Sequence, residues 1–422
     1  MTTVRTLVAC AVKKGWGMFQ LDVNNAFLHR DLHEEVYMKV PQGLEIPNPG
    51  LVCKLNKSLY GLKQASRQWY AKLTEALSFR GYTHSHYDHS LFYRKAGPLV
   101  VFVAVYVDDV ILTGTDTTEI VQLKVYLDDT FKIKDLGRLH YFLGLEILDT
   151  TEGVLISQRK FVLDLLREYD CFNYAPLSSP LDPTVKLRAK EGPPLSDPTF
   201  YRKLIGKLNF LTNTRLDIAF SVQQLNQFMQ DPRAPHLQAA YHFLRYLKKD
   251  PTLGVHLSMD PDCTVQAFCD SDWASCPDSR RSVSGYLVLL GNSPISWKSK
   301  KQETVSLSSA EAEYRSLRKV VGELTWLHRL LTELTVPISS PIAVYCDSQS
   351  AIYIARNPVF HERTKHIEVD CHFVRNKLQE GLISLHHVST SDQLADILTK
   401  ALTGVKHSVI LHKLAVKSSP PT

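Results

Sequence analysis

The chain has 422 residues, a formal net charge of +6 at neutral pH and 44% hydrophobic residues. This length exceeds one typical domain, so two or three domains are expected, and the mild basic excess fits a polyanionic partner without demanding one. No apolar run reaches the roughly 18 residues of a membrane-spanning helix and the N-terminus lacks a signal-peptide pattern, so the composition excludes a membrane protein and predicts an intracellular one.

Residues 1 to about 175 alternate helical patterns with strands, as an α+β domain would. The strongest strand lies at 98–107, where β-branched and aromatic residues indicate burial on both faces. A second apolar run at 111–113 predicts a tight hairpin with Asp108 and Asp109 at its tip. Two adjacent carboxylates need a cation to compensate their charge, and magnesium is the candidate. An exposed Asp-Asp turn without a ligand is the alternative.

The rest of the chain changes pattern twice. A Pro- and Ser-rich stretch at 175–194 predicts an extended connector, and helical periodicity follows at 199–249. Beyond it, strands and helices alternate and predict a small α/β domain that contains a long helix at 308–334. The predicted domains are 1–175, 176–261 and 262–404, with a tail at 405–422. Eight cysteines without a CxxC pair predict reduced thiols.

Several strings occur in the order typical of one family, the Pol polyproteins of copia-type LTR retrotransposons. The sequence resembles that family through QLDVNNAFLHRDLHEEVYM (20–38), KSLYGLKQASRQWY (57–70), YVDDVILTG (106–114), SSAEAEY (308–314), CDSQSAI (346–352) and DQLADILTK (392–400). The resemblance implies an α+β fold with a reverse-transcriptase palm whose fingers are largely missing, a helical thumb or connection, and an α/β ribonuclease H-like domain.

The resemblance assigns the polymerase site to Asp22, Asp108 and Asp109, which would hold two magnesium ions for nucleotidyl transfer. Phe27 matches the aromatic residue that excludes a 2′-hydroxyl, and Gly61 matches a glycine of the nucleotide pocket. Two of these residues have a plainer alternative: Asp22 is a good helix N-cap, and a phenylalanine such as Phe27 in an apolar run usually belongs to the core.

For the nuclease, the resemblance implies two magnesium ions held by four carboxylates on four elements, namely Asp270, Glu313, Asp347 and Asp396. Competing acids have structural roles: Glu311 forms a capping box with Ser308, and Asp392 is predicted to cap the last helix. Asp272 stays outside the set. The segment 363–366 resembles a phosphate-contacting segment of the family.

The resemblance thus implies an RNA-directed DNA polymerase joined to a ribonuclease H. Its partners would be an RNA template, a DNA primer, deoxynucleoside triphosphates, the RNA:DNA hybrid and other products of a retrotransposon polyprotein. Its location would be the cytoplasm, in virus-like particles, and the nucleus. Since family members carry basic fingers strands before the first matched string, hybrid cleavage is expected to exceed primer extension. The alternative is a polymerase-inactive remnant or domesticated scaffold that binds nucleic acid without chemistry.

Overall fold

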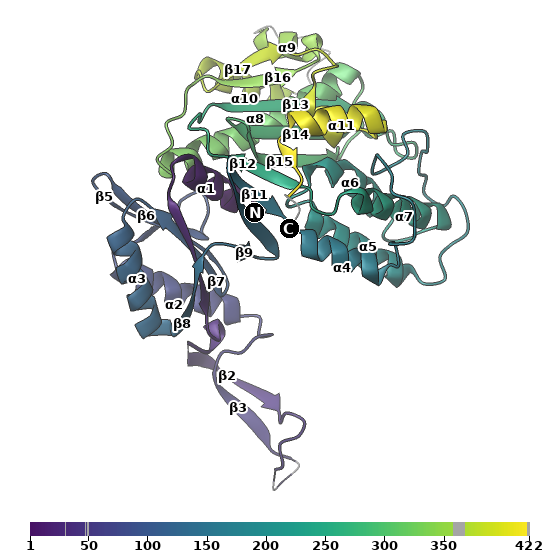
Figure 1. Cartoon of the computed structure of the whole chain (residues 1–422). Coiled ribbons are helices and arrows are strands. Elements are labelled where there is room, and N and C mark those ends of the chain that lie inside the picture. Colours follow the sequence, from purple (N-terminus) through teal and green to yellow (C-terminus); the bar gives the residue numbers. More distant parts are fainter. Residues whose placement is uncertain (30, 47, 49, 358–367, 420–422) are drawn as a thin grey trace. The chain divides into compact units, whose positions relative to one another are not determined.

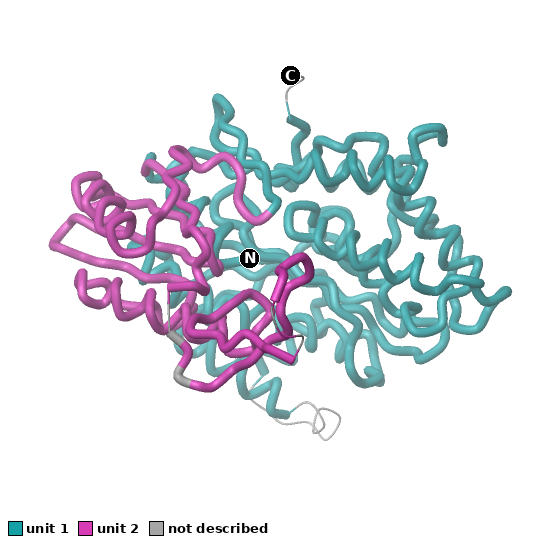
Figure 2. The backbone as a smooth tube through the Cα atoms, turned by 90° about the horizontal axis from the view of Figure 1, so that it is seen from below, with its two compact units in different colours: residues 1–15, 144–422 teal, residues 16–143 magenta. Residues whose placement is uncertain are grey.

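The computed structural model describes residues 1–29, 31–46, 48, 50–357 and 368–419. It divides into two compact units, with unit 1 made of residues 1–15 and 144–422 and unit 2 of residues 16–143 (Figure 2). The mixed α+β class matches the sequence prediction. No helix within the described ranges is long and apolar enough to cross a membrane. The predicted phosphate-contacting segment 363–366 lies outside the described residues.

Unit 2 is built on an antiparallel sheet in the order β4-β5-β6-β7-β1-β8 (Figure 1). Its strands are β1 (Gly17–Val23), β4 (Thr83–His84), β5 (Leu91–Ala96), β6 (Leu99–Tyr106), β7 (Asp109–Gly114) and β8 (Ile133–Arg138). The helices α2 (Ala65–Phe79) and α3 (Thr117–Phe131) share a hydrophobic core with alternate residues of the central strands, so they pack on one face. The remaining elements are η1 (Ala26–His29), the paired strands β2 (Asp31–Lys39) and β3 (Val52–Lys57), and β9 (Tyr141–Phe142).

The predicted hairpin is formed by β6 and β7. Residues 100–105 are all at most 8% exposed, which confirms that this strand is buried on both faces. The hairpin register pairs Tyr106 with Asp109. The turn therefore consists of Val107 and Asp108, and Val107 adopts a φ of 58° to close it. Trp69 on α2 donates its indole N–H to the Val107 carbonyl at 2.6 Å, which ties the turn to the helix layer.

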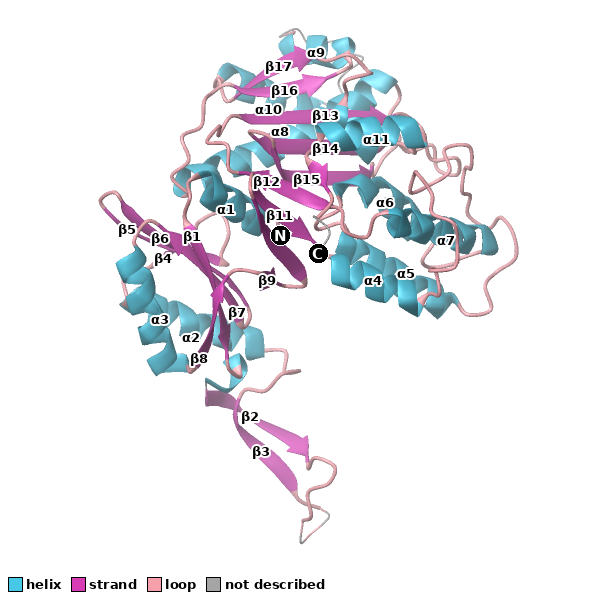
Figure 3. Ribbon diagram, viewed as in Figure 1, coloured by secondary structure: helices cyan, strands magenta, loops and turns pink. Residues whose placement is uncertain are grey.

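Unit 1 contains two sheets (Figure 3). One has the antiparallel order β18-β12-β11-β10, from β10 (Leu145–Thr150), β11 (Gly153–Ser157), β12 (Gly254–Ser258) and β18 (Val416–Lys417). The other has the order β15-β14-β13-β16-β17, from β13 (Val265–Asp272), β14 (Val283–Leu290), β15 (Ser293–Lys301), β16 (Ile342–Cys346) and β17 (Ile383–His387). In this second sheet β13, β14 and β15 are antiparallel neighbours, whereas β16 runs parallel to both β13 and β17.

Apart from the N-terminal helix α1 (Thr2–Lys13), the helices of unit 1 form two groups. One group shares its own core and consists of α4 (Arg159–Glu168), α5 (Pro198–Leu211), α6 (Ala219–Asn226) and α7 (Ala234–Lys249), with η2 (Leu216–Ile218) between α5 and α6. The other surrounds the second sheet and consists of α8 (Ser309–Glu333), α9 (Gln349–Arg356), α10 (Glu368–Gln379), η4 (Leu394–Leu398) and α11 (Gly404–Lys413). The start of α8 confirms Ser308 as the cap, since its hydroxyl oxygen accepts a hydrogen bond from the Glu311 amide at 3.2 Å. The return bond of the predicted capping box differs, because the Glu311 carboxylate accepts the Leu307 amide at 2.8 Å and not the Ser308 amide.

The compact units do not follow the predicted domain boundaries. The N-terminal helix α1 (Thr2–Lys13), predicted within the 1–175 domain, belongs to unit 1 and packs against β12 and β15. Its Arg5 donates hydrogen bonds to the carbonyls of Ile295 at 3.0 Å and Asn213 at 2.9 Å. The pairing of β11 with β12 also crosses the boundary at 175. Strand pairing over about 100 residues leaves no local mark in the sequence, which explains the error.

The predicted tail at 405–422 is wrong for residues 405–417. They form α11 and β18, and β18 pairs with β12. His407 of α11 is only 2% exposed and its ring meets the edge of Tyr246, with ring centroids 5.2 Å apart. The segment is short, and tertiary contacts bury its apolar residues Ile410, Leu414 and Val416.

A buried ion pair lies beneath α11. Arg215 and Asp217 are each 1% exposed and share two hydrogen bonds, from Nε to Oδ1 at 2.9 Å and from Nη2 to Oδ2 at 2.8 Å. The Tyr246 hydroxyl donates to Asp217 Oδ2 at 2.6 Å. The carboxylate thus has charge-assisted partners on both oxygens, which is the condition for burying such a pair.

We expect Asp217→Asn to lower the free energy of unfolding by about 3–5 kcal/mol, because the buried guanidinium of Arg215 would lose its counter-ion. Denaturant unfolding followed by circular dichroism would measure the change. Glu303→Gln is the matched control, since Glu303 forms an exposed pair with Lys300 and should lose less than about 1 kcal/mol. Equal losses in the two variants would contradict the importance of the buried pair.

Candidate active sites

Three predicted carboxylates meet at one end of the unit 2 sheet. Asp22 on β1 is the direct register partner of Asp109 on β7. Asp108 lies in the turn before β7, and its carbonyl accepts the Val23 amide at 2.9 Å. Since Asp22 lies inside a strand, the alternative of a helix N-cap is wrong. Opposed residues of antiparallel strands have Cα atoms only about 4.5–5.5 Å apart, so the three side chains share one small region.

The environment of these carboxylates disfavours their combined negative charge. Burial raises the pKa of Asp109, a hydrogen bond from Gln20 at 3.4 Å opposes this rise, and the nearby Asp108 and Asp22 add to it. The Tyr60 hydroxyl donates to Asp108 Oδ2 at 3.1 Å. Burial and the Asp108 carboxylate raise the pKa of Tyr60, so this hydroxyl keeps its proton and remains a donor. A cation at this edge would relieve the remaining repulsion.

Phe27 and Gly61 lie close to this edge. Phe27 is 8% exposed within the core, and its ring centroid is 4.3 Å from that of Tyr60, which is 55% exposed. Gly61 has a φ of 99° and open space where a Cβ would stand, so its backbone needs glycine and a ligand could approach. The core alternative for Phe27 fits its burial, and its sugar-selecting role stays a prediction. Tyr60, which contacts both Phe27 and Asp108, was missed although it lies in the matched string SLYGLKQ.

The second site follows from the register of two parallel strands in unit 1. Cys269 on β13 pairs with Cys346 on β16. Asp270 and Asp347 each follow one of these paired residues, so both lie at the same edge of the sheet. Glu313 on α8 reaches this edge, where Oε1 accepts the backbone N–H that follows Asp270 at 3.1 Å. Three of the four predicted carboxylates therefore converge from three separate elements.

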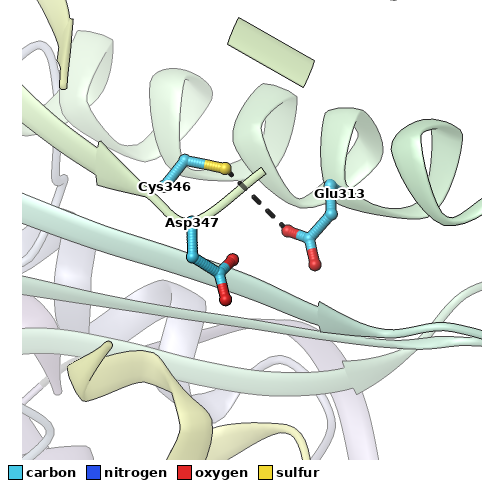
Figure 4. A group of neighbouring side chains, drawn as sticks. All are labelled: Glu313, Cys346 and Asp347. Carbon is cyan, nitrogen blue, oxygen red and sulfur yellow. Dashed lines mark hydrogen bonds between the residues drawn. The ribbon is translucent and has the colours of Figure 1, made fainter. Parts of the chain in front are cut away.

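The side chains of Glu313, Cys346 and Asp347 form a group that could hold a metal ion (Figure 4). One ligand atom from each lies within 4.8 Å of the other two, and it is the only such group in the part of the chain that the structure describes. Asp347 is partly exposed and accepts a hydrogen bond from the Thr390 hydroxyl at 3.2 Å. The carboxylate oxygens suit a hard divalent cation. The thiol was missed, although it directly precedes Asp347.

Asp396 on η4 is held in a different way. Its side chain is fully buried between two ammonium groups, with Lys400 Nζ 2.8 Å from Oδ1 and Lys406 Nζ 2.6 Å from Oδ2. Lys400 Nζ also lies 3.5 Å from Asp270 Oδ2. Two lysines thus neutralise the Asp270–Asp396 side of the site. Both were missed, although Lys400 ends the matched string DQLADILTK.

Close backbone approach places η4 on the sheet. A Cβ at Gly285 on β14 would stand 2.7 Å from Leu398 Cβ, so only glycine allows this contact.

The predicted N-cap at Asp392 is wrong. Gln393 caps η4 by accepting the Ala395 amide at 3.1 Å, and Asp392 pairs with Lys413.

Two of the converging carboxylates have a raised pKa. Burial raises the pKa of Glu313, and the negative charge of Asp270 raises it further. Burial also raises the pKa of Asp270, which Lys400 opposes. Burial likewise raises the pKa of Asp272, and Lys400 opposes the rise. Asp272 is not part of the group formed by Glu313, Cys346 and Asp347. A divalent cation would release these protons by supplying compensating charge.

Comparisons with known proteins place these geometries in context. The family model described as "Reverse transcriptase (RNA-dependent DNA polymerase)" matches residues 1–183. Over its whole length the chain is 44% identical to the retrovirus-related Pol polyprotein from transposon RE1 of Arabidopsis thaliana, and it spans 29% of that relative. It is 31% identical, over 72% of its length, to a transposon Ty5-1 protein of Saccharomyces cerevisiae that it covers completely.

Among solved structures, a similar one is the crystal structure of LC11-RNase H1 in complex with RNA/DNA hybrid. The match has 13% identity and a TM-score of 0.25, and it covers 32% of this chain and 93% of that chain. A TM-score this low does not by itself establish a shared fold.

We expect the metal-free protein to lose stability as pH rises above the ordinary Glu pKa of 4.5, because the raised pKa of Glu313 lets the folded state keep a proton that the unfolded state releases. Glu313→Gln lacks this titration. The variant should therefore unfold at a higher temperature than the parent at about pH 8 in EDTA, with a smaller gap near pH 5. Glu303→Gln, at an exposed position, should follow the parent at both pH values. If the difference in unfolding temperature between Glu313→Gln and the parent did not change with pH, the raised pKa of Glu313 would be contradicted.

Proposed function

The chain belongs to the family of retrovirus-related Pol polyproteins of copia-type transposons, and from this membership we propose that it couples RNA-directed DNA synthesis with cleavage of RNA in RNA:DNA hybrids. One observation carries the proposal: each compact unit holds its own cluster of acidic side chains at the edge of a sheet. Two separate clusters suit two separate reactions on phosphodiesters.

In the nuclease cluster, Glu313 and Asp347 would hold magnesium together with Asp270. When bound, divalent cations activate water and neutralise charge that develops on the scissile phosphate. The amide after Asp270 orients Glu313, and the Thr390 hydroxyl orients Asp347. Asp396 would contribute by fixing Lys400 beside Asp270, at 3.5 Å. Fixed orientation of this kind lowers the reorganisation that the reaction requires.

In the palm cluster, Asp22, Asp108 and Asp109 would hold magnesium for nucleotidyl transfer from deoxynucleoside triphosphates to a DNA primer on an RNA template. Tyr60 orients Asp108 through its hydroxyl and exposes its ring beside the carboxylates. A sugar or base of the incoming nucleotide would meet this ring and the open backbone at Gly61. The proposal thus gives Tyr60 a role in substrate placement.

For the nuclease we expect Asp347→Asn to lower magnesium-dependent cleavage of an RNA:DNA hybrid at least about a hundredfold, since loss of a charged ligand removes several kcal/mol of transition-state stabilisation. A labelled hybrid oligonucleotide would measure the rate. Asp392→Asn is the matched control, because Asp392 is an exposed acid on the loop before η4 and should leave the rate within about twofold of the parent. Hybrid binding by the parent without any cleavage would instead support the scaffold alternative.

For the palm we expect Asp108→Asn to abolish primer extension on an RNA template while hybrid cleavage stays near the parent rate, because the two clusters lie in different units. Asp129→Asn on the exposed side of α3 serves as the control. Primer extension and hybrid cleavage would be measured on the same preparations. Equal loss of both activities in Asp108→Asn would contradict separate sites.

A further inference from the structure

We propose that Glu313, Cys346 and Asp347 bind Zn²⁺, and that Zn²⁺ bound there blocks the nuclease site. Binding follows from the geometry of the three side chains alone, whereas inhibition rests on the proposed function. A thiol is not a ligand that magnesium prefers, so a cysteine within this group changes which cations the site can take.

The distances require only a small adjustment. The three ligand atoms lie within 4.8 Å of one another, and Cys346 Sγ is 4.0 Å from Glu313 Oε2. Zinc bonds of about 2.3 Å to sulfur and about 2.0–2.2 Å to oxygen separate two tetrahedral ligands by about 3.5 Å. Side-chain movements of less than about 1 Å would therefore close the group around one ion. Figure 4 shows the thiol of Cys346 and the carboxylate of Glu313 directed toward each other.

Burial gives the group the character of a built site. Cys346 is fully buried and Glu313 is 8% exposed, while Asp347 is partly exposed at the end of β16. An ion could enter from the side of Asp347 and keep a fourth position open there, as metal sites with three protein ligands do. The two buried ligands would lose little conformational freedom on binding, because packing already fixes them.

A second thiol lies on the strand next to Cys346. All eight cysteines are free, and Cys269 is the register partner of Cys346 on the neighbouring strand. Cys269 is also fully buried, and its Sγ lies 3.8 Å from the Tyr345 carbonyl oxygen. Zinc is bound by the thiolate form, so the proton of Cys346 would pass to solvent on binding. Divalent zinc exceeds magnesium in affinity for sites that contain sulfur.

Inhibition follows from competition for the same oxygens. Glu313 and Asp347 are the carboxylates that the proposed function assigns to magnesium. A zinc ion held by them and by the thiol would keep a tetrahedral arrangement rather than the octahedral one of magnesium. The reacting phosphate would then lack the ion geometry that hydrolysis needs, and removal of zinc by a chelator would restore cleavage.

Binding is tested on the full chain without reference to activity. Zn²⁺ is titrated calorimetrically into metal-free protein, and Cd²⁺ is added separately to record the ultraviolet band of a cadmium–thiolate bond. We expect Cys346→Ser to weaken Zn²⁺ binding at least tenfold and to remove that band. Cys171→Ser, which changes an equally buried thiol in the helical group, should behave as the parent. Asp347→Asn provides a second variant at a partly exposed position and should also weaken Zn²⁺ binding. Unchanged Zn²⁺ affinity and an unchanged Cd²⁺ band in Cys346→Ser would overturn the site.

Inhibition is then measured at fixed magnesium with each protein normalised to its own rate without zinc. We expect Zn²⁺ to inhibit the parent reversibly. Inhibition of Cys346→Ser to the same extent should require at least tenfold more Zn²⁺. If zinc binds as expected but the parent cleaves hybrid at an unchanged rate, the inhibitory role is overturned and the binding site stands. If the parent cleaves no hybrid with magnesium alone, the proposed function fails, and the titration still decides the binding site.

Discussion

Carboxylates can be crowded at the edge of a sheet only when positive charge or protons accompany them, and this constraint governs both sites of the protein. For two acids of one site, the structure shows how the negative charge is compensated or avoided. Asp396 is fully buried because Lys400 and Lys406 contact its two oxygens. Among the described residues Glu313 has no such cationic partner, and burial raises its pKa so that it holds a proton instead. The same chain therefore uses two solutions to one electrostatic problem within one site.

The two solutions divide the nuclease site into halves with different properties. The half around Asp396 is already neutral without a metal. Binding of a cation there would therefore bring little electrostatic stabilisation unless a lysine moved away. In the half around Glu313 and Asp347 the described residues form no ion pair, so a bound cation would lower the electrostatic free energy most at that position. Cys346 lies in the same half, which is why the choice of cation matters there.

The palm site depends on the same constraint but meets it with less burial. Asp22, Asp108 and Asp109 lie around a two-residue turn, and water can reach part of each side chain. Hydrogen bonds from Tyr60 and Gln20 orient two of the three acids without adding positive charge. The remaining repulsion is left for a ligand to relieve. A site that is oriented but not neutralised is suited to take up cations together with a charged substrate.

The sequence by itself determined the elements whose patterns are local. The apolar run before Asp108 specified a buried strand and a tight hairpin, and Ser308 with Glu311 specified the start of α8, because pleat alternation and capping depend on residues a few positions apart. The matched strings also identified the acids that the fold brings together at each edge. Local pattern placed Asp392 wrongly, because the capping competition with Gln393 is decided by how η4 lies on β14.

Only the tertiary structure decided which distant segments belong together. Nothing near residues 2–13 or 404–417 shows that these segments pack in unit 1, because the strands that α1 and β18 contact lie more than 100 residues away in the chain. The structure also revealed contacts that the sequence could not show. Two lysines contact Asp396, a tyrosine contacts Asp108, and a thiol lies beside Glu313. Charge compensation acts through space at a few ångströms, and the sequence records neither that distance nor the direction in which a side chain points.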